Sequence, residues 1–236
     1  MLLLVLVTLI LAGVTMVIAC YTDVRSRSVN SFLFLPLVVV AGISTFLQGV
    51  GPVPVLSLAG LYLFSFLSRK PIIYIAGGLA IFAMTLFFSL NNPYCVGYVL
   101  FVMIPYLIAY RERLFGVGDV KAIIALSLAF YVLPDNLMFL PLVPPYMALP
   151  FSFLLLLNSS FASIAFLPYL VALNYARGSR LGMHSLMGME YREEEKIKNP
   201  ERYSVVESSQ GKFLVYRIPY MIPIAIGMLI ALFTGV

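Results

Sequence analysis

Two carboxylates in this chain could do chemistry together. Asp119 follows two glycines in FGVGDVK (115–121), at the start of an apolar run, and Asp23 follows another apolar run in YTDVRSR (21–27). A carboxylate at membrane depth costs about 3 kcal/mol even on the gentler insertion scales, so both residues are functional candidates. Two carboxylates that share one proton can activate a water molecule, as in aspartic proteases. The pair predicts a membrane-embedded aspartyl peptidase with Asp23 and Asp119 as catalytic residues.

The composition predicts the setting for these carboxylates. Of 236 residues, 62% are hydrophobic and 11% are charged, and the mean hydropathy is +1.02. A soluble domain carries about 25% charged residues, so the composition excludes a water-exposed globule and favours an integral membrane protein. Long apolar runs favour helices over the short alternating strands of a barrel. We expect an all-α polytopic membrane protein at the cell membrane, surrounded by the lipid bilayer, with no nucleic acid partner.

About eight transmembrane helices are expected, with the first run kept as a span rather than removed as a signal peptide. The apolar segments run over Leu2–Cys20, Phe32–Val50, Val53–Ser68, Pro71–Leu90, Cys95–Tyr110, Val120–Leu140, Tyr146–Tyr175 and Ile218–Val236. Residues 32–68 would be about 55 Å long as one helix, nearly twice the hydrocarbon thickness, so GVGP (49–52) is expected to divide them. The long segment 146–175 is expected to be tilted or to break near Asn158.

The basic residues predict the orientation. If the spans alternate, all 15 lysines and arginines lie on one side, which is cytoplasmic by the positive-inside rule. Both termini then face outward. Asp23 and Asp119 are separated by an even number of spans, so both are expected at the cytoplasmic face.

Three regions are expected. Residues 1–175 form a membrane domain that carries both aspartates, 176–217 form a cytoplasmic loop, and 218–236 form the last transmembrane helix. The loop alternates in polarity on both sides of SSQG (208–211), which predicts a β-hairpin. Its lone His184 has no second ligand, and we expect no metal and no cofactor.

The residues near the aspartates have both structural and functional interpretations. Asp119 could simply cap a helix, but Gly116 and Gly118 would additionally allow unusual backbone angles and close approach of a peptide. Asp23 could pair with Arg25 or Arg27, although a carboxylate at a helix C-terminus opposes the helix dipole. Supporting roles are possible for Arg25, Arg27 and Lys121, which are also suited to anchoring at lipid phosphates.

The sequence lacks the residues that other catalytic mechanisms require. The chain has no GxSxG, no HExxH and no cysteine cluster, and its only histidine is His184. A serine or metal mechanism therefore has no support in the sequence.

Three short blocks resemble a known family. DVRSRSVN (23–30) resembles the first-aspartate block of the type IV prepilin peptidases, and GVGDVK (116–121) resembles their GxGD block. IPYMIP (218–223) is similar to a segment of the archaeal preflagellin peptidases. The resemblance implies an endopeptidase that removes the short basic leader from pilin-like or archaellin precursors at the cytoplasmic membrane face, with catalytic aspartates at Asp23 and Asp119.

The chain also departs from the family. Bacterial members carry a tetracysteine zinc domain and N-methylate the product, whereas this chain has two cysteines. This difference favours the archaeal branch without methylation. Four spans are expected between the aspartates, in contrast to two in the archaeal preflagellin enzymes, so the choice between pilin and archaellin substrates stays open, as does the oligomeric state.

Two alternatives remain. The first is an intramembrane protease like presenilin or signal peptide peptidase, which also uses GxGD but places its first aspartate in a Tyr-Asp pair inside a span. The second is a non-enzymatic transporter, which predicts ionisable groups near the bilayer midplane and internal repeats. The sequence shows neither the Tyr-Asp pair nor these transporter features.

Overall fold

The computed structural model describes most of the apolar segments and parts of the polar loop. It covers residues 2–68, 70–109, 116–131, 150–176, 189–190, 203–208, 211–216 and 219–234. Arg69, Arg111, Arg113, His184 and residues 132–140 of the sixth expected span lie outside the described residues.

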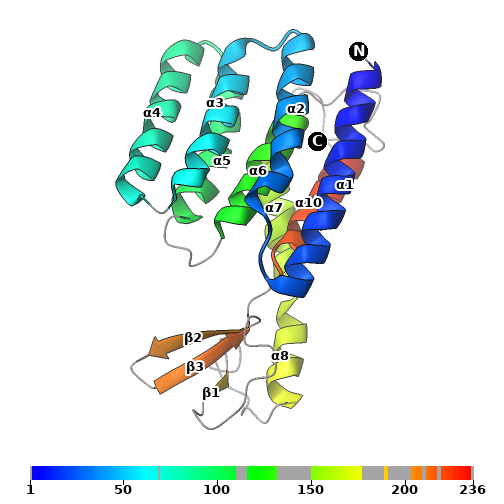
Figure 1. The fold of residues 1–236 in the computed structure, drawn as a ribbon, viewed down its shortest axis with the longest axis vertical. Coiled ribbons are helices and arrows are strands. Elements are labelled where there is room, and N and C mark those ends of the chain that lie inside the picture. Colours follow the sequence, from blue (N-terminus) through cyan, green and yellow to red (C-terminus); the bar gives the residue numbers. More distant parts are fainter. Residues whose placement is uncertain are drawn as a thin grey trace.

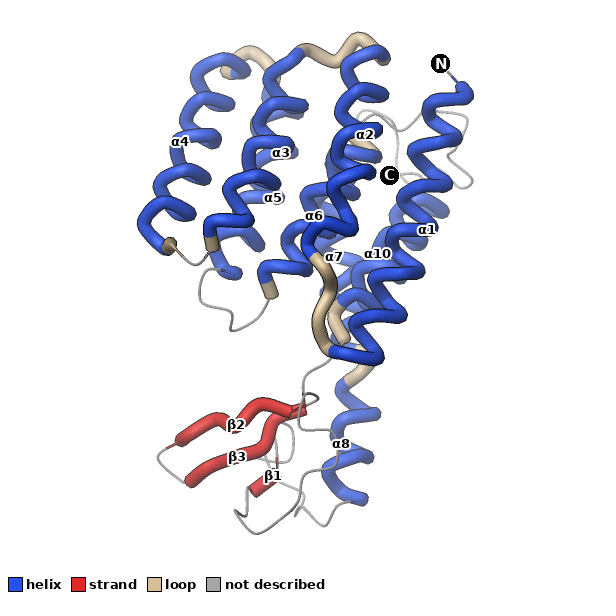
Figure 2. The backbone as a smooth tube through the Cα atoms, in the orientation of Figure 1, coloured by secondary structure: helices blue, strands red, loops and turns tan. Residues whose placement is uncertain are grey.

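Helices form a bundle, and α8 and three short strands lie beyond one end of it (Figures 1 and 2). The helical elements are α1 (Leu2–Ser26), the 3-10 turn η1 (Ser31–Phe34), α2 (Leu35–Leu47), α3 (Pro52–Phe64), the 3-10 turn η2 (Ser65–Leu67), α4 (Pro71–Ser89), α5 (Pro93–Ala109), α6 (Val117–Ala129), α7 (Phe151–Ile164), α8 (Leu167–Ala176) and α10 (Met221–Thr234). The last helix packs against α7, α1 and α6, so residues 218–236 contribute to the same bundle as residues 1–175.

Proline and glycine set several helix boundaries. Pro52, Pro71 and Pro93 are the first residues of α3, α4 and α5, where the missing N–H of proline has no intrahelical acceptor to lose. Gly49 has a φ of 84°, a conformation that glycine adopts without steric cost. The chain therefore turns between α2 and α3 at the predicted GVGP corner.

The overlong segment 146–175 breaks at a different place from the one expected. Asn158 lies inside α7, and the helix ends at Ile164, followed by a turn at Ala165 and Phe166. Pro168 lies in the first turn of α8, where it cannot donate a backbone hydrogen bond to the preceding helix. The position of the break is therefore explained by Pro168 rather than by the polar run at 158–160.

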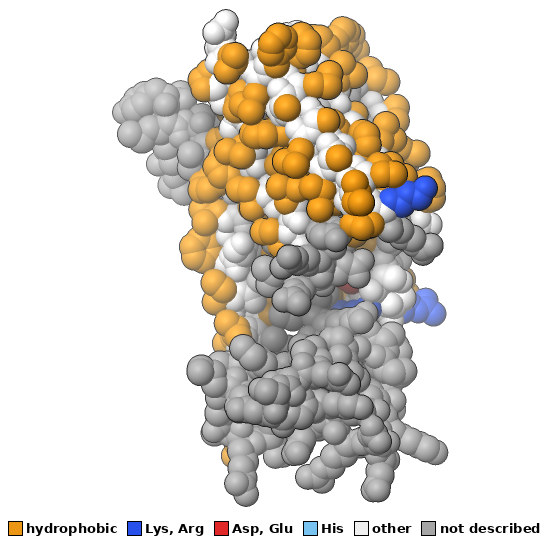
Figure 3. All heavy atoms as spheres, turned by 90° about the vertical axis from the view of Figure 1, so that its left-hand side faces the viewer, with side chains coloured by type: hydrophobic (Ala, Val, Ile, Leu, Met, Phe, Trp, Pro, Cys, Tyr) orange, Lys and Arg blue, Asp and Glu red, His pale blue; other side chains and the backbone are white. Residues whose placement is uncertain are grey.

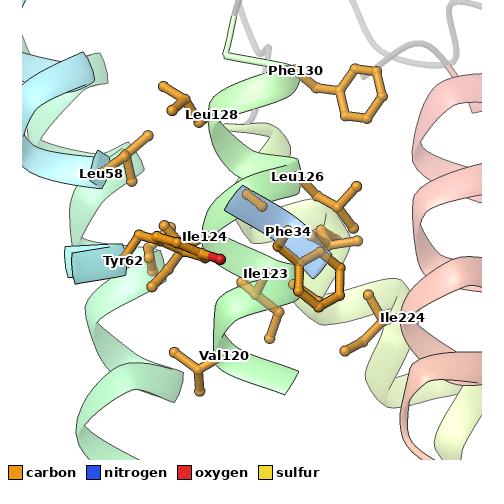
Figure 4. Close-up of a cluster of buried hydrophobic side chains, with 14 of the residues drawn as sticks. Phe34, Leu58, Tyr62, Val120, Ile123, Ile124, Leu126, Leu128, Phe130 and Ile224 are labelled. Atoms are coloured by element: carbon orange, nitrogen blue, oxygen red, sulfur yellow. The ribbon is translucent and has the colours of Figure 1, made fainter. Parts of the chain in front are cut away.

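The core is built around α6, which packs against α1, α2, α3, α5, α7 and α10. Every residue from Val120 to Leu128 is buried. Figure 4 shows Ile123, Leu126 and Leu128 of this helix among Phe34 from η1 and Leu58 from α3. A helix that is buried on all sides has a continuously hydrophobic sequence rather than an amphipathic one. Because α6 lies at the centre of the bundle, Asp119 in its first turn has a fixed position.

The strands form one antiparallel sheet. β1 (Met189–Glu190), β3 (Gly211–Tyr216) and β2 (Tyr203–Ser208) are ordered β1-β3-β2, and Ser208 pairs with Gly211 at the turn. The segments expected to form a hairpin are the ones that pair as β2 and β3. An all-α description is therefore correct for the bundle, while this loop subdomain contributes a small sheet.

Three helical stretches are long and apolar enough to cross a membrane: Leu3–Ser26, Pro71–Ser89 and Phe151–Tyr169, of which the last includes the turn between α7 and α8. Shorter apolar helices cover Ser31–Leu47, Pro52–Leu67, Pro93–Ala109 and Met221–Phe233. On α4, Ile72 is 82% exposed and Phe87 is 74% exposed. Hydrophobic side chains cover the visible upper face of the molecule, with lysine and arginine side chains at its lower border (Figure 3). Such an apolar surface is typical of a protein in contact with lipid.

Candidate functional site

Asp23 lies in the last turn of α1 and is buried, with 8% of its surface exposed. This corrects the sequence-based placement, because the helix continues to Ser26 instead of ending at Cys20. The Asp23 carboxyl oxygen Oδ2 accepts a hydrogen bond from the backbone N–H of Met221, at 3.1 Å. Met221 is the first residue of α10, and the positive end of that helix dipole favours a carboxylate. At the Asp23 carboxylate, the favourable dipole of α10 therefore offsets the unfavourable dipole of α1.

Asp119 is the third residue of α6 rather than the residue that precedes the helix. The cap position belongs to Gly116, and the Asp119 carboxyl oxygen Oδ2 accepts a hydrogen bond from the Gly116 N–H, at 2.8 Å. A carboxylate at the third helical position that reaches back to the cap satisfies a free backbone N–H. The carboxyl group is thereby held in a fixed orientation at the positive end of α6.

The fold brings the two aspartates together. The charge of Asp23 acts on the carboxyl group of Asp119, and α1, α6 and α10 pack pairwise. Figure 1 shows the end of α1 and the starts of α6 and α10 at the same end of the bundle, the one nearer the sheet. Both catalytic candidates therefore lie on helices that meet at the same end of the bundle.

Met221 connects the three helices of the site. The Cys20 thiol donates a hydrogen bond to the Met221 carbonyl oxygen at 3.3 Å, one turn of α1 before Asp23. The Met221 side chain is 1% exposed, and its Cε lies 3.9 Å from the position of a Cβ built on Gly118. The Met221 backbone therefore contacts α1, and the Met221 side chain lies beside Gly118 of α6.

The two glycines of the motif do not adopt unusual backbone angles, contrary to the expectation from the sequence. Gly116 has φ −74° and ψ 155°, and Gly49 is the one glycine with positive φ among the described residues. A Cβ on Gly116 would lie 3.3 Å from the Asp119 carboxyl oxygen. Close packing beside Asp119, rather than backbone conformation, restricts this position.

The three basic residues near the site differ in their surroundings. Arg25 is exposed and its Nη1 donates to the Tyr21 hydroxyl at 3.2 Å. Arg27 is half-buried, and its charge interacts with Asp23. Lys121 is 3% exposed, and its Nζ lies 3.7 Å from the centroid of the Phe66 ring. Lys121 is too buried to anchor at lipid phosphates and instead makes a cation–π interaction.

A hydroxyl cluster near Asp119 was not predicted from the sequence. The side chains of Ser163 and Ser160 of α7 lie beside the Tyr220 hydroxyl, and the charge of Asp119 acts on it. Tyr220 stands directly before α10, in the block IPYMIP. The spacing of Ser160 and Ser163 could have indicated this cluster, because residues three apart lie on the same face of a helix.

No metal centre emerges from the described residues, among which no group of three or more His, Cys, Asp or Glu side chains could hold an ion. The candidate site comprises two carboxyl groups, the backbone N–H groups of Gly116 and Met221, the Cys20 thiol and the charge of Arg27. Comparison of the chain with protein-family models, with curated proteins and with solved structures finds no match.

Proposed function

We propose that this protein is a membrane aspartyl endopeptidase that removes the short basic leader from pilin-like or archaellin precursors. The observation that carries the proposal is that the charge of Asp23 acts on Asp119, while Asp23 accepts a hydrogen bond from the start of α10. These residues come from helices far apart in the chain, and each carboxyl group is held by one backbone N–H.

The chemistry follows from two carboxyl groups that share one proton. The ionised carboxylate takes a proton from a bound water molecule, and the water oxygen forms a bond to the scissile carbonyl carbon. The protonated carboxyl group donates a hydrogen bond to the carbonyl oxygen. Collapse of the tetrahedral intermediate breaks the C–N bond, and the leaving amine takes up a proton from a carboxyl group.

Substrate class and family come from the resemblance of residues 23–30 and 116–121 to the type IV prepilin peptidases. The absence of a tetracysteine pattern from the sequence favours the archaeal branch, in which leader removal occurs without methylation. A basic leader would be cut just before the hydrophobic helix of the precursor.

The topology belongs to the same proposal. Eight spans place both aspartates at the cytoplasmic face and both termini outside, because every lysine and arginine then lies on one side. The end of the bundle nearer the sheet, where α1 ends and α6 and α10 begin, would be the cytoplasmic end.

Co-expression with precursors tests the proposed function. The protein is expressed with a pilin-type or an archaellin-type precursor, and the product is analysed by N-terminal sequencing. Cleavage just before the hydrophobic helix is expected for the wild type. A well-inserted wild-type protein that cleaves neither precursor contradicts the proposal; cleavage within the hydrophobic helix would favour an intramembrane protease.

A further inference from the structure

We propose that Cys20 is a positioning residue of this site, which acts on Asp23 through the first residue of α10. The inference rests on the proposed peptidase function and adds a residue to it. The Cys20 thiol donates a hydrogen bond to the Met221 carbonyl oxygen at 3.3 Å, and the Met221 N–H donates to the Asp23 Oδ2 at 3.1 Å. Cys20 and Asp23 are three residues apart in α1 and therefore lie on the same face of that helix. One face of α1 thus binds both peptide groups of a single residue of α10.

The backbone donors at the start of α10 explain why Asp23 contacts Met221. The first N–H groups of a helix have no intrahelical acceptor and need other partners. Two neighbouring N–H groups donate to carbonyl oxygens that directly precede the helix: Ile222 to Pro219 at 3.3 Å and Ile224 to Tyr220 at 3.2 Å. Pro223 has no N–H to donate. The Met221 N–H is therefore the donor of this turn that is left for the Asp23 carboxyl group, so the position of Met221 sets the geometry of this contact.

The Cys20 thiol bonds to another helix, whereas three hydroxyl groups of α1 bond to their own backbone. These hydroxyl groups donate to carbonyl oxygens one turn earlier: Thr8 to Leu4 at 2.9 Å, Thr22 to Ile18 at 3.0 Å and Ser26 to Thr22 at 2.8 Å. A side chain that bonds to its own helix in this way holds no second helix in place. The thiol is a weaker donor than a hydroxyl, but its acceptor belongs to the residue that binds Asp23. Cys20 therefore fixes the start of α10 relative to α1.

Two contacts hold Met221 more firmly than one. With the Asp23 contact alone, the first turn of α10 would be free to pivot about a single hydrogen bond. The Cys20 contact is made to the next peptide group and removes this freedom. The Met221 side chain is 1% exposed, and its Cε lies 3.9 Å from the position of a Cβ built on Gly118, the residue before Asp119. Cys20 therefore helps to set the position of Asp23 relative to α6, the helix that carries Asp119.

Full-length Cys20→Ala, in detergent micelles with a precursor substrate, tests the inference. Single-turnover cleavage at increasing enzyme excess gives a maximal rate and a half-saturating concentration. We expect the maximal rate to fall by about 3- to 10-fold, the effect of losing one neutral hydrogen bond. The half-saturating concentration should stay at the wild-type value, because the variant alters the position of Asp23 and not the binding of the precursor.

Cys95→Ala is the matched control, because the chain has two cysteines and this variant makes the same change at the other one. Cys95 lies in the first turn of α5, a helix that carries none of the site residues. Cys95 is buried, whereas Cys20 is partly exposed. The melting temperature of Cys95→Ala should therefore fall at least as far as that of Cys20→Ala, while its maximal rate stays at the wild-type value.

Two further measurements show whether Cys20 acts through Met221. Met221→Pro lacks the N–H that binds Asp23, so adding Cys20→Ala to that variant should cause no further loss of rate. The infrared S–H stretching band of Cys20, obtained as the difference between the spectra of the wild type and Cys20→Ala, needs no substrate. A hydrogen-bonded thiol absorbs at a lower frequency than a free thiol, and we expect the lower frequency for Cys20.

The outcomes separate the two claims. A wild-type maximal rate in Cys20→Ala, or a further loss of rate when it is added to Met221→Pro, overturns the role of Cys20 and leaves the peptidase function standing. An equal loss of rate in Cys95→Ala also overturns it, because the effect would then be structural. An S–H band at the frequency of a free thiol overturns the contact itself. A wild-type protein that cleaves no precursor overturns the proposed function and the positioning role with it, whereas the infrared band still reports the contact.

Discussion

The backbone N–H of Met221 donates a hydrogen bond to the carboxyl group of Asp23, at 3.1 Å. This contact joins the last helix of the chain to the first. It places the positive end of α10 beside a carboxylate that otherwise faces the negative end of α1. The start of the last helix therefore contributes a hydrogen-bond donor to Asp23.

Replacing Met221 with proline should remove this hydrogen bond while keeping the helix. Met221 is the first residue of α10, a position where proline is tolerated. A hydrogen bond to a charged group contributes about 1.5–3 kcal/mol, so cleavage should fall by roughly 10- to 100-fold. Met221→Leu keeps the N–H and should cleave within about threefold of the wild type. Similar rates in the two variants would show that the hydrogen bond does not matter.

Gly118→Ala should make the protein more stable and less active. Gly118 lies in α6, where alanine is favoured over glycine by about 1 kcal/mol, and a Cβ there meets nothing closer than 3.9 Å. If the glycine is needed for close approach of a peptide, cleavage should fall as the melting temperature rises. Gly13→Ala is the control, because a Cβ at Gly13 of α1 meets nothing within 4 Å. Unchanged cleavage in Gly118→Ala would show that this glycine is not needed for close approach of the substrate.

The two arginines after Asp23 should respond differently to neutralisation. Arg27 interacts with the charge of Asp23, whereas Arg25 is exposed and bonded to Tyr21. Arg27→Gln should lower the cleavage rate by about 3- to 10-fold, as expected for loss of about 1 kcal/mol. Arg25→Gln should stay within about twofold. Equal losses would indicate that both residues act through the membrane surface.

Lys121 and Phe66 should be energetically coupled. A buried cation over an aromatic face contributes about 0.5–2 kcal/mol, and the Lys121 Nζ lies 3.7 Å from the ring centroid. A double-mutant cycle of Lys121→Met and Phe66→Leu, measured by thermal unfolding, should give a coupling free energy in that range. Additive effects of the two substitutions would rule out the interaction.

The helices were predictable from the sequence because their signals are local. Apolar runs of membrane length predict helices, and GVGP at 49–52 predicts the corner between α2 and α3. The segment 146–175 breaks after Ile164 rather than near Asn158, because Pro168 cannot donate a backbone hydrogen bond to the preceding helix. A proline in the first turn of a helix is the stronger signal.

The composition of the site was only half predictable. Asp23 and Asp119 are recognisable because a carboxylate beside an apolar run is costly. Their proximity is a product of helix packing, since nothing in the sequence states that α1 meets α6 and α10. The Met221 N–H is a backbone group, and every residue except proline has one, so no sequence pattern marks it.

The most direct test of the account compares Asp23→Asn, Asp119→Asn and the double variant in single-turnover cleavage of a precursor. Two carboxyl groups that act as one unit lose their function together, so effects are non-additive. Each single variant should fall to the same residual rate as the double variant, with Glu207→Gln on β2 as an active control. Substantial cleavage by either single variant, or losses that multiply in the double variant, would contradict a shared catalytic site.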